Sequence, residues 1–370
     1  MWLKLEQRPE PSRLMRYLSP LLAVALMVAS GMLLFHLLGK SPVEGFRVFF
    51  LNPIQDKYGV AELFLKATPL ILCAVGLAVG FRGNIWNIGA EGQLTMGAIA
   101  GGGVALWFGD SDSSLAMPLM LLAGVLGGMA WAAIPAFLRT RFNTNEILVT
   151  LMLVYIAQLA LSWLVHGPWR DPQGQNYPQS QGFGDAETMS VLINGTRVTW
   201  GIVYALGLAV VAWVFSQKTF AGFRMQVAGL APAAAAYAGF SEKRNIWIAL
   251  MLCGATAGLA GICEVAGPIG RLQQQISPGY GFAAIIVAWI GRLHPIGVVF
   301  GALLMSLLYL GGESAQMGMG LPSAITGLFQ GLLLFYLLAA DLFITFRLKR
   351  TAAPEAAAST PKPATTLENA

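Results

Sequence analysis

Long apolar runs recur along almost the whole chain, and they restrict its possible folds more than any other feature. A hydrocarbon core about 30 Å thick is crossed by a helix of roughly 20 apolar residues. Measured against that length, the chain contains ten candidate spans: residues 20–38, 61–80, 88–108, 115–138, 146–165, 200–217, 246–263, 280–291, 295–311 and 321–346. The eighth run is too short to cross unaided. The sequence therefore predicts an all-α, polytopic bundle of about ten transmembrane helices with broken or re-entrant segments.

The small share of charged residues agrees with lipid as the main solvent. Charged residues make up 11% of the chain and hydrophobic residues 56%, whereas an average soluble protein carries about 25% charged residues. The three cysteines, Cys73, Cys253 and Cys263, lie in apolar runs without a CxxC spacing. We interpret them as small core residues rather than a disulfide or metal set.

The distribution of Lys and Arg predicts the orientation of the bundle. With ten spans both termini lie on the same side, and placing them in the cytoplasm puts sixteen of the 23 basic residues inside. That excess follows the positive-inside rule. The predicted organisation has a cytoplasmic segment at 1–19, a transmembrane domain at 20–346 and a low-complexity, disordered cytoplasmic tail at 347–370, with an outer loop at 166–199 and an inner loop at 218–245.

The sequence carries no recognisable cluster of catalytic side chains. The three histidines, His36, His166 and His294, fall in the first span, the outer loop and an inner turn, so they are not expected to share a metal or a substrate. The sequence predicts no catalytic residue, no metal and no cofactor, and therefore no enzyme. Basic residues are scattered at the ends of apolar runs rather than gathered in a patch, so no nucleic acid is expected as a partner.

The most informative polar stretch runs from Phe81 to Gln93, between the second and third spans. Polar side chains at membrane depth are expensive, and they are kept where they face a cavity or a partner. If the stretch is helical, Asn84, Asn87 and Glu91 recur at i, i+3 and i+7 and share one face. The stretch, Gln93 included, is interpreted either as the lining of a path or gate, or as a polar junction between two helices.

A second polar stretch, from Glu264 to Gly281, contains three consecutive glutamines that begin at Gln273, and Tyr280. Its glycines and prolines indicate irregular backbone, which is allowed at membrane depth only where it is buried in protein or lines a water-filled space. Gln273 and Tyr280 are therefore candidate path residues. The alternative is an ordinary outer loop that joins two helices.

The inner loop contains a predicted short helix. Proline at its start, an alanine run and a glycine at its end are typical of helix boundaries. A small apolar helix on the inner face indicates a docking partner, and the alternative is an amphipathic surface helix. The candidate docking residues are Gly229, Pro232, Ala235, Tyr237 and Gly239.

Several of these stretches together resemble one family of transport proteins. The segments that carry the resemblance are GNIWNIGAEGQLTMGA (83–98), NEILVTLMLVYIA (145–157), GPWRDPQGQNYPQS (167–180), GLAPAAAAYAGF (229–240) and SPGYGFAAIIVAWIGRLHPIG (277–297). They are similar to membrane permease subunits of ATP-binding-cassette importers, in the branch for branched-chain amino acids, ribose and nucleosides, and most of all to nucleoside (simple-sugar-type) permeases. The resemblance covers roughly residues 60–345.

The resemblance implies a set of partners and a location. A periplasmic or lipoprotein binding protein would deliver a nucleoside or related riboside, and two permease subunits, expected to be different chains, would enclose its path. A separate cytoplasmic ATPase would bind ATP and drive alternating access through the docking helix. The expected location is the bacterial inner (cytoplasmic) membrane, with lipid around the spans and both termini in the cytoplasm.

The resemblance also assigns roles to individual residues. The implied path or gate residues are Asn84, Asn87, Glu91, Gln93, Gln273 and Tyr280. This chain departs from the family pattern at Val154, where an asparagine is usual, and in the docking loop at Ala231 and Ala236, where an asparagine and a basic residue are common. The first departure removes one polar contact from the path. In the docking loop the shape and the small residues persist, but the polar group at position 231 and the positive charge at position 236 are absent.

Two other functions stay open at the level of the sequence. An importer of the same class would carry ribose, another sugar or an amino acid. A secondary transporter would instead use Glu91 and Glu264 as ion-coupling carboxylates at broken helices.

Overall fold

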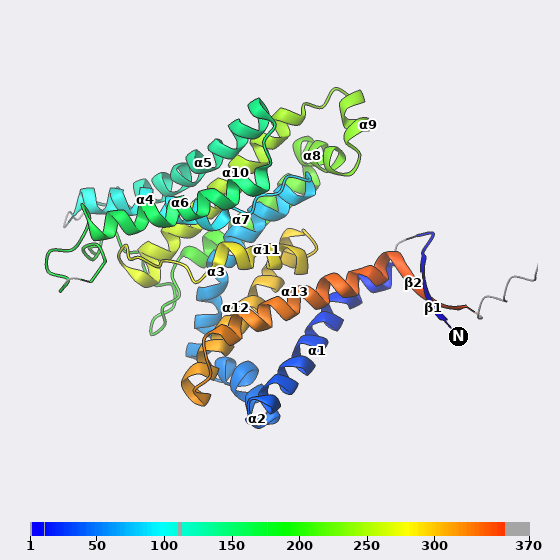
Figure 1. The fold of residues 1–370 in the computed structure, drawn as a ribbon. Coiled ribbons are helices and arrows are strands. Elements are labelled where there is room, and N and C mark those ends of the chain that lie inside the picture. The colour runs from blue at the N-terminus through cyan, green and yellow to red at the C-terminus, as the bar shows by residue number, and fades with distance from the viewer. Residues whose placement is uncertain (1, 11, 110–112, 176, 352–370) are drawn as a thin grey trace, which may run out of the picture. The chain divides into compact units, whose positions relative to one another are not determined.

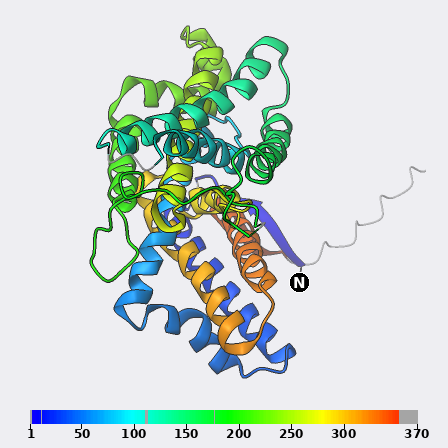
Figure 2. The ribbon, with the colours of Figure 1, turned by 90° about the vertical axis from the view of Figure 1, so that its left-hand side faces the viewer.

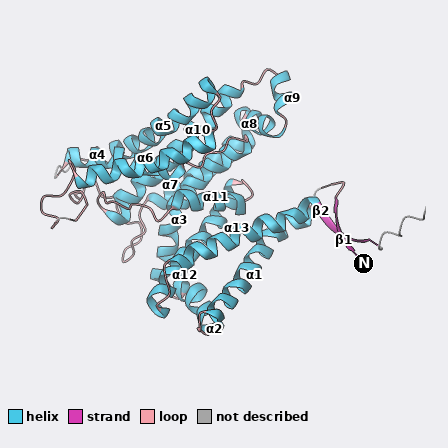
Figure 3. Ribbon diagram, in the orientation of Figure 1, coloured by secondary structure: helices cyan, strands magenta, loops and turns pink. Residues whose placement is uncertain are grey.

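The computed structural model describes residues 2–10, 12–109, 113–175 and 177–351. The chain divides into two compact units, one made of Ser30–Gly331 and the other of Met1–Ala29 together with Leu332–Ala370. Each unit is described by itself. Figure 3 shows that helices make up most of the chain and that the strands are confined to one pair of terminal segments.

Each of the ten predicted spans contains a helix, as Figure 1 shows by colour along the chain. These helices are α1 (Arg13–Leu37), α3 (Lys57–Arg82), α4 (Ala90–Phe108), α5 (Ala116–Phe142), α6 (Glu146–His166), α7 (Gly201–Lys218), α10 (Glu242–Glu264), α11 (Tyr280–Ile290), α12 (Pro295–Met319) and α13 (Ala324–Thr345). Among the described residues, eight helices are long and apolar enough to cross a membrane. Of the ten helices above, α4 and α11 are the two outside that set, and α11, with 11 residues, is as short as predicted.

Shorter elements join these helices. They are α2 (Pro42–Phe46), a π-helix at Arg47–Leu51, a 3₁₀ turn at Asn52–Ile54, α8 (Phe220–Leu230), α9 (Pro232–Tyr237) and a second π-helix at Val265–Ile269. Side chains close several helix starts. Asp56 accepts from the Gly59 N–H at the start of α3, and Ser41 does the same for Glu44 in α2. Such caps satisfy backbone donors that have no partner inside the helix.

The core of the 30–331 unit lies where α10 crosses α4 and α5. A Cβ atom added to Gly97 would collide with the backbone of Gly258, and one added to Gly258 would collide with the carbonyl oxygen of Gly124. Small residues at such crossings allow helix backbones to approach closely, which is how helices associate in lipid. α3 runs beside α10 and is buried along most of its length.

The two ends of the 30–331 unit carry different connections. Figure 1 places α8 and α9 at one end and the connection between α6 and α7 at the other. That connection is ordered by backbone bonds to the segment after α10, from Phe183 to Gly270 and from Met189 to Ala266. Figure 2 shows this green loop crossing the yellow segment that follows α10. The predicted outer loop is therefore packed against the bundle and does not hang free of it.

The other unit contains two strands that the sequence analysis did not predict. β1 (Trp2–Gln7) pairs antiparallel with β2 (Phe346–Thr351), with Trp2 opposite Thr351. Glu6 and Arg347 form a cross-strand ion pair of 3.1 Å. Residues 347–351 of the predicted disordered tail thus belong to β2, and the rest of that tail lies outside the described residues. α1 also begins at Arg13, inside the segment assigned to 1–19.

Candidate functional site

The polar stretch between α3 and α4 is not helical. Residues 85–89 have irregular backbone, and Asn84 lies in the left-handed region with φ of 55°. Asparagine tolerates this region better than most residues because its short side chain bonds locally. The predicted shared face of Asn84, Asn87 and Glu91 is therefore wrong, and the three side chains lie in different surroundings.

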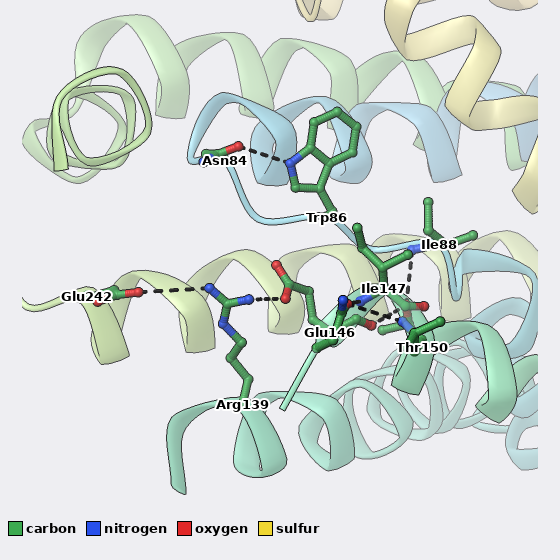
Figure 4. Close-up of polar contacts among 10 residues, drawn as sticks. Asn84, Trp86, Ile88, Arg139, Glu146, Ile147, Thr150 and Glu242 are labelled. Atoms are coloured by element: carbon green, nitrogen blue, oxygen red, sulfur yellow. Dashed lines mark hydrogen bonds and ion pairs between the residues drawn. The ribbon is translucent and has the colours of Figure 1, made fainter. Parts of the chain in front are cut away.

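Asn84 lies at the α8–α9 end of the unit. Its Oδ1 accepts a hydrogen bond of 2.9 Å from the Trp86 indole N–H, as Figure 4 shows. The same residue lines a small cavity beside Pro232 and Ala235 of α9. The structure thus places Asn84 with the predicted docking residues and not with the other predicted path residues.

Asn87 and Gln93 form a buried amide pair. The Asn87 Nδ2 donates to the Gln93 Oε1 at 2.9 Å, and the Asn87 Oδ1 accepts from the Gly89 N–H at 2.9 Å. Both side chains are shielded from solvent. Because their hydrogen bonds are used to close the turn before α4, they stabilise the junction rather than line a cavity.

Glu91 links α4 to α11. Its Oε2 accepts a hydrogen bond of 2.7 Å from the Gly281 backbone N–H, in the first turn of α11. The side chain is only 2% exposed. A Cβ atom on Gly281 would collide with the Glu91 backbone, so a glycine is required for this approach. Carboxylates are favourable at helix N-termini because unpaired N–H groups and the helix dipole face them.

Glu91 also lines a cavity of about 830 Å³ between α4, α6 and the segment before α11. We name it the amide-rich cavity, after the side chains Gln158, Gln273, Gln274 and Gln275. Hydroxyl groups of Tyr155, Ser162 and Tyr177 join them. The cavity thus combines one carboxylate, several amides and aromatic hydroxyls, which can donate and accept hydrogen bonds to a polar solute.

The remaining predicted path residues are Gln273 and Tyr280. Gln273 lines the amide-rich cavity, and its Nε2 donates to the Gln275 carbonyl at 2.9 Å. Tyr280 is buried instead, with its ring against Tyr309 at 5.4 Å between centroids. Sequence reasoning missed Gln158 and Ser162, although an amide and a hydroxyl four residues apart in the apolar α6 were a usable signal.

The predicted docking residues lie on α8, α9 and their connections. Pro232 begins α9, Ala235 is buried beneath it and Gly239 follows it with φ of 76°. Tyr237 is 97% exposed. Gly229 of α8 touches the end of α3 so closely that a Cβ atom would collide with the Arg82 carbonyl. The predicted docking loop is therefore packed against α3 and presents an exposed aromatic side chain.

A partly buried ion-pair network joins three neighbouring elements at this end (Figure 4). Arg139, in the last turns of α5, pairs with the buried carboxylate of Glu146 in α6 and lies 4.0 Å from Glu242 at the start of α10. The Thr150 hydroxyl accepts from the Ile88 N–H at 3.2 Å and so attaches α6 to the segment before α4. This network was not predicted from the sequence.

Three aromatic rings connect the same end to α11. Phe81 of α3, Trp86 and Trp289 of α11 lie within 6.3 Å of one another, centroid to centroid, and Trp86 is stacked on Trp289 at an interplanar angle of 24°. α11 is therefore held at its first turn by Glu91, beside the amide-rich cavity, and at its last turn by Trp86, beside the docking loop.

Comparison with known proteins gives a consistent family. The family model described as "Branched-chain amino acid transport system / permease component" matches residues 59–338. A glucose ABC transporter permease protein of Haloferax volcanii is 34% identical, over 93% of each chain. A guanosine ABC transporter permease protein of Bacillus subtilis is 30% identical over 92% of this chain and 99% of its own length. A nucleoside ABC transporter permease protein of Lactococcus lactis is 29% identical over 94% of this chain and 97% of its own.

The match to the family model covers most of the bundle, including both the amide-rich cavity and the docking loop. The relatives align over nearly their full lengths, so the likeness extends beyond a shared segment. The chain belongs to the family of branched-chain amino acid transport system permease components, and it is a permease subunit of an ABC transporter.

Proposed function

We propose that this permease imports nucleosides or related ribosides across the inner membrane by alternating access. The observation that carries the proposal is the amide-rich cavity, in which Glu91 and Gln158 face the same space as Gln273. A riboside offers sugar hydroxyls to a carboxylate, and its base offers donors and acceptors to side-chain amides. Tyr155 and Tyr177 supply aromatic surface for the base. The guanosine and nucleoside relatives support this substrate class.

The proposal includes a second permease subunit, a different chain, as the opposite wall of the path. Gln158 lies on α6 in the middle of an apolar span and lines a cavity that is partly open. Polar side chains at membrane depth do not face lipid, because their hydrogen-bonding groups would remain unsatisfied there. A second subunit that covers this side of α6 would supply a partner for the Gln158 amide and close the path.

We further propose that the α8–α9 end faces the cytoplasm and binds a separate ATPase, so this chain itself binds no ATP, metal or other cofactor and is not an enzyme. The excess of Lys and Arg on that side supports the orientation. The pairing of β1 with β2 supports placing both termini on the same side of the membrane. A binding protein would then deliver substrate to the opposite end, where the loop between α6 and α7 lies.

Transport by the reconstituted assembly tests the substrate class. Proteoliposomes that contain both permease subunits, the ATPase and the binding protein should take up radiolabelled guanosine or uridine. This uptake should require ATP on the side of the membrane where the ATPase is bound. Excess unlabelled nucleoside should compete, and excess glucose, ribose or leucine should not. Uptake of radiolabelled glucose but not of radiolabelled nucleoside would overturn the substrate class, and uptake that follows an ion gradient without ATP would overturn the importer.

A further inference from the structure

A small cavity lies beneath the docking helix. Its volume is about 130 Å³, and it is enclosed by α9, the start of α10 and the segment after α3. Its rim is exposed at Pro232 and Glu242, whereas its floor is buried at Ala235 and Ile246. We name it the docking cavity.

Asn245, in the first turn of α10, lines the docking cavity and is only 2% exposed. Its backbone N–H donates to the Ser241 carbonyl at 3.2 Å, so the main chain is satisfied. Its side chain is different, because neither Nδ2 nor Oδ1 has a hydrogen-bond partner among the described residues. A buried amide without partners destabilises a fold, and an apolar side chain of similar shape would suit this place better.

We propose that the docking cavity is a socket for a polar group of the ATPase subunit, and that Asn245 is the residue with which this group pairs. An occupant that satisfies both ends of the amide must itself donate and accept, as a side-chain or main-chain amide does. The proposal rests on the proposed function, because it needs an ATPase at this end of the permease.

The size and the rim of the docking cavity favour this occupant. A water molecule occupies about 30 Å³ in the liquid, so the space suits a side chain or a few waters and is far too small for a nucleotide. Arg139 and Glu242 place one positive and one negative group at the cavity. A neutral group with both a donor and an acceptor suits such a rim better than an ion of either sign.

The position of the docking cavity between α9 and α10 would also allow it to transmit movement. α9 is bounded by the non-helical Ala231, with φ of −143°, and by Gly239 in the left-handed region, so it forms a short rigid piece between two bends. Ala235 of α9 and Asn245 of α10 border the same cavity. A group inserted there would contact both helices, and it would therefore transmit a movement of the ATPase to α10 as well as to α9.

The test compares Asn245→Leu with the unaltered full-length chain, first as isolated permease and then with the ATPase. Removal of an unpaired buried amide should raise the melting temperature of the isolated permease by roughly 2 °C or more. The same change should weaken ATPase binding about tenfold, measured by titrating purified ATPase onto immobilised permease in nanodiscs. Asn245→Asp, which keeps the shape but loses the donor, should also weaken binding.

Thr144→Val is the matched control. The Thr144 hydroxyl oxygen is likewise buried without a partner among the described residues, but it does not line the docking cavity. This variant should raise the melting temperature and leave ATPase affinity unchanged. A lower melting temperature for Asn245→Leu would show that the amide is already paired, for example by water, and an unchanged affinity would show that no partner group reaches it. Either result overturns the socket. Failure of the unaltered permease to bind any ATPase would instead overturn the proposed function.

Discussion

Glu91 accepts a hydrogen bond of 2.7 Å from the backbone N–H of Gly281, and this single contact joins the start of α4 to the start of α11. The carboxylate therefore has two tasks at once. It closes the N-terminus of α11, and it borders the amide-rich cavity. A change in the cavity at Glu91 is transmitted directly to α11, because no intervening side chain separates them.

Glu91→Gln should separate these two tasks. Glutamine keeps an acceptor for the Gly281 N–H but loses the negative charge, whose interaction with a helix N-terminus contributes about 0.3–1 kcal/mol. We expect a small decrease in melting temperature and a decrease in nucleoside uptake of about tenfold, equivalent to about 1.4 kcal/mol. Glu44→Gln, at an exposed carboxylate in the first turn of α2, is the control and should change neither. Stability loss in proportion to uptake loss would assign Glu91 a structural role alone.

Gly229→Ala should disturb the contact between the docking loop and α3. The added methyl group would collide with the Arg82 carbonyl, which is backbone and cannot rotate away. We expect α8 to shift, with ATP hydrolysis retained by the ATPase but uptake per ATP reduced. Gly207→Ala is the control, since that glycine has no neighbouring atom within 4 Å of an added Cβ. Equal uptake per ATP in both variants would argue against transmission through this contact.

Trp289→Leu should weaken the aromatic connection between α11 and the docking end. Leucine keeps an apolar side chain, although a smaller one, and loses the stacking on Trp86, which contributes about 0.5–1.5 kcal/mol beyond the buried area. We expect the ATPase to co-purify normally while uptake decreases, because α11 is no longer held at its last turn. Trp107→Leu, at a side chain that is 80% exposed, provides the comparison. Loss of co-purification in Trp289→Leu would place the defect in docking instead.

Arg139→Met should destabilise the permease by leaving the Glu146 carboxylate buried without its cation. Breaking a buried ion pair costs about 3–5 kcal/mol, and partial exposure of Arg139 reduces the expected cost to about 2 kcal/mol. Glu146→Gln in the same chain should recover most of the lost melting temperature, since a neutral amide needs no counter-charge. A double variant no more stable than Arg139→Met would show that the arginine acts through packing.

The sequence predicted the spans well because apolar length is a local property. Each of the ten apolar runs contains a helix, and the short run at 280–291 is short in the structure as well. The strands β1 and β2 could not be found in the same way. Each has only six residues, and its partner lies at the other end of the chain.

The candidate site could be predicted only in part, because residue polarity is a local property and hydrogen-bond pairing is not. Polar residues in apolar surroundings drew attention to Glu91 and Gln273, which line one cavity in the structure, but residue type alone did not reveal their partners. Asn84 adopts a left-handed backbone conformation, which turns the chain and places the Asn84 side chain apart from Glu91. Asn87 was predicted to line a path, yet its amide is used up by Gln93 and Gly89. Hydrogen-bond pairing of this kind depends on the backbone path, which polarity alone does not define.

We expect the stability of the fold to depend on pH through His294, at the start of α12. Its Nδ1 accepts from the Ile296 N–H at 3.3 Å and so caps α12, which requires an unprotonated nitrogen at that position. Burial and the nearby positive charge of Arg82 lower the pKa of His294. Because the folded state favours the neutral ring, this group stabilises the fold fully above its unfolded pKa of about 6.5, and the contribution is lost as the pH falls through the lower folded pKa.

We therefore expect the melting temperature of the permease to fall as the pH is lowered from about 7.5 to about 5.5, in part through His294. His294→Asn should flatten that part of the curve, because asparagine is a strong N-cap residue that does not titrate in this range. The measurement is thermal unfolding of both proteins at matched pH and salt, and the difference between the curves isolates this residue from the carboxylates. Parallel curves would mean that the cap survives protonation, for instance by rotation of the ring, and that the α12 start tolerates the charge.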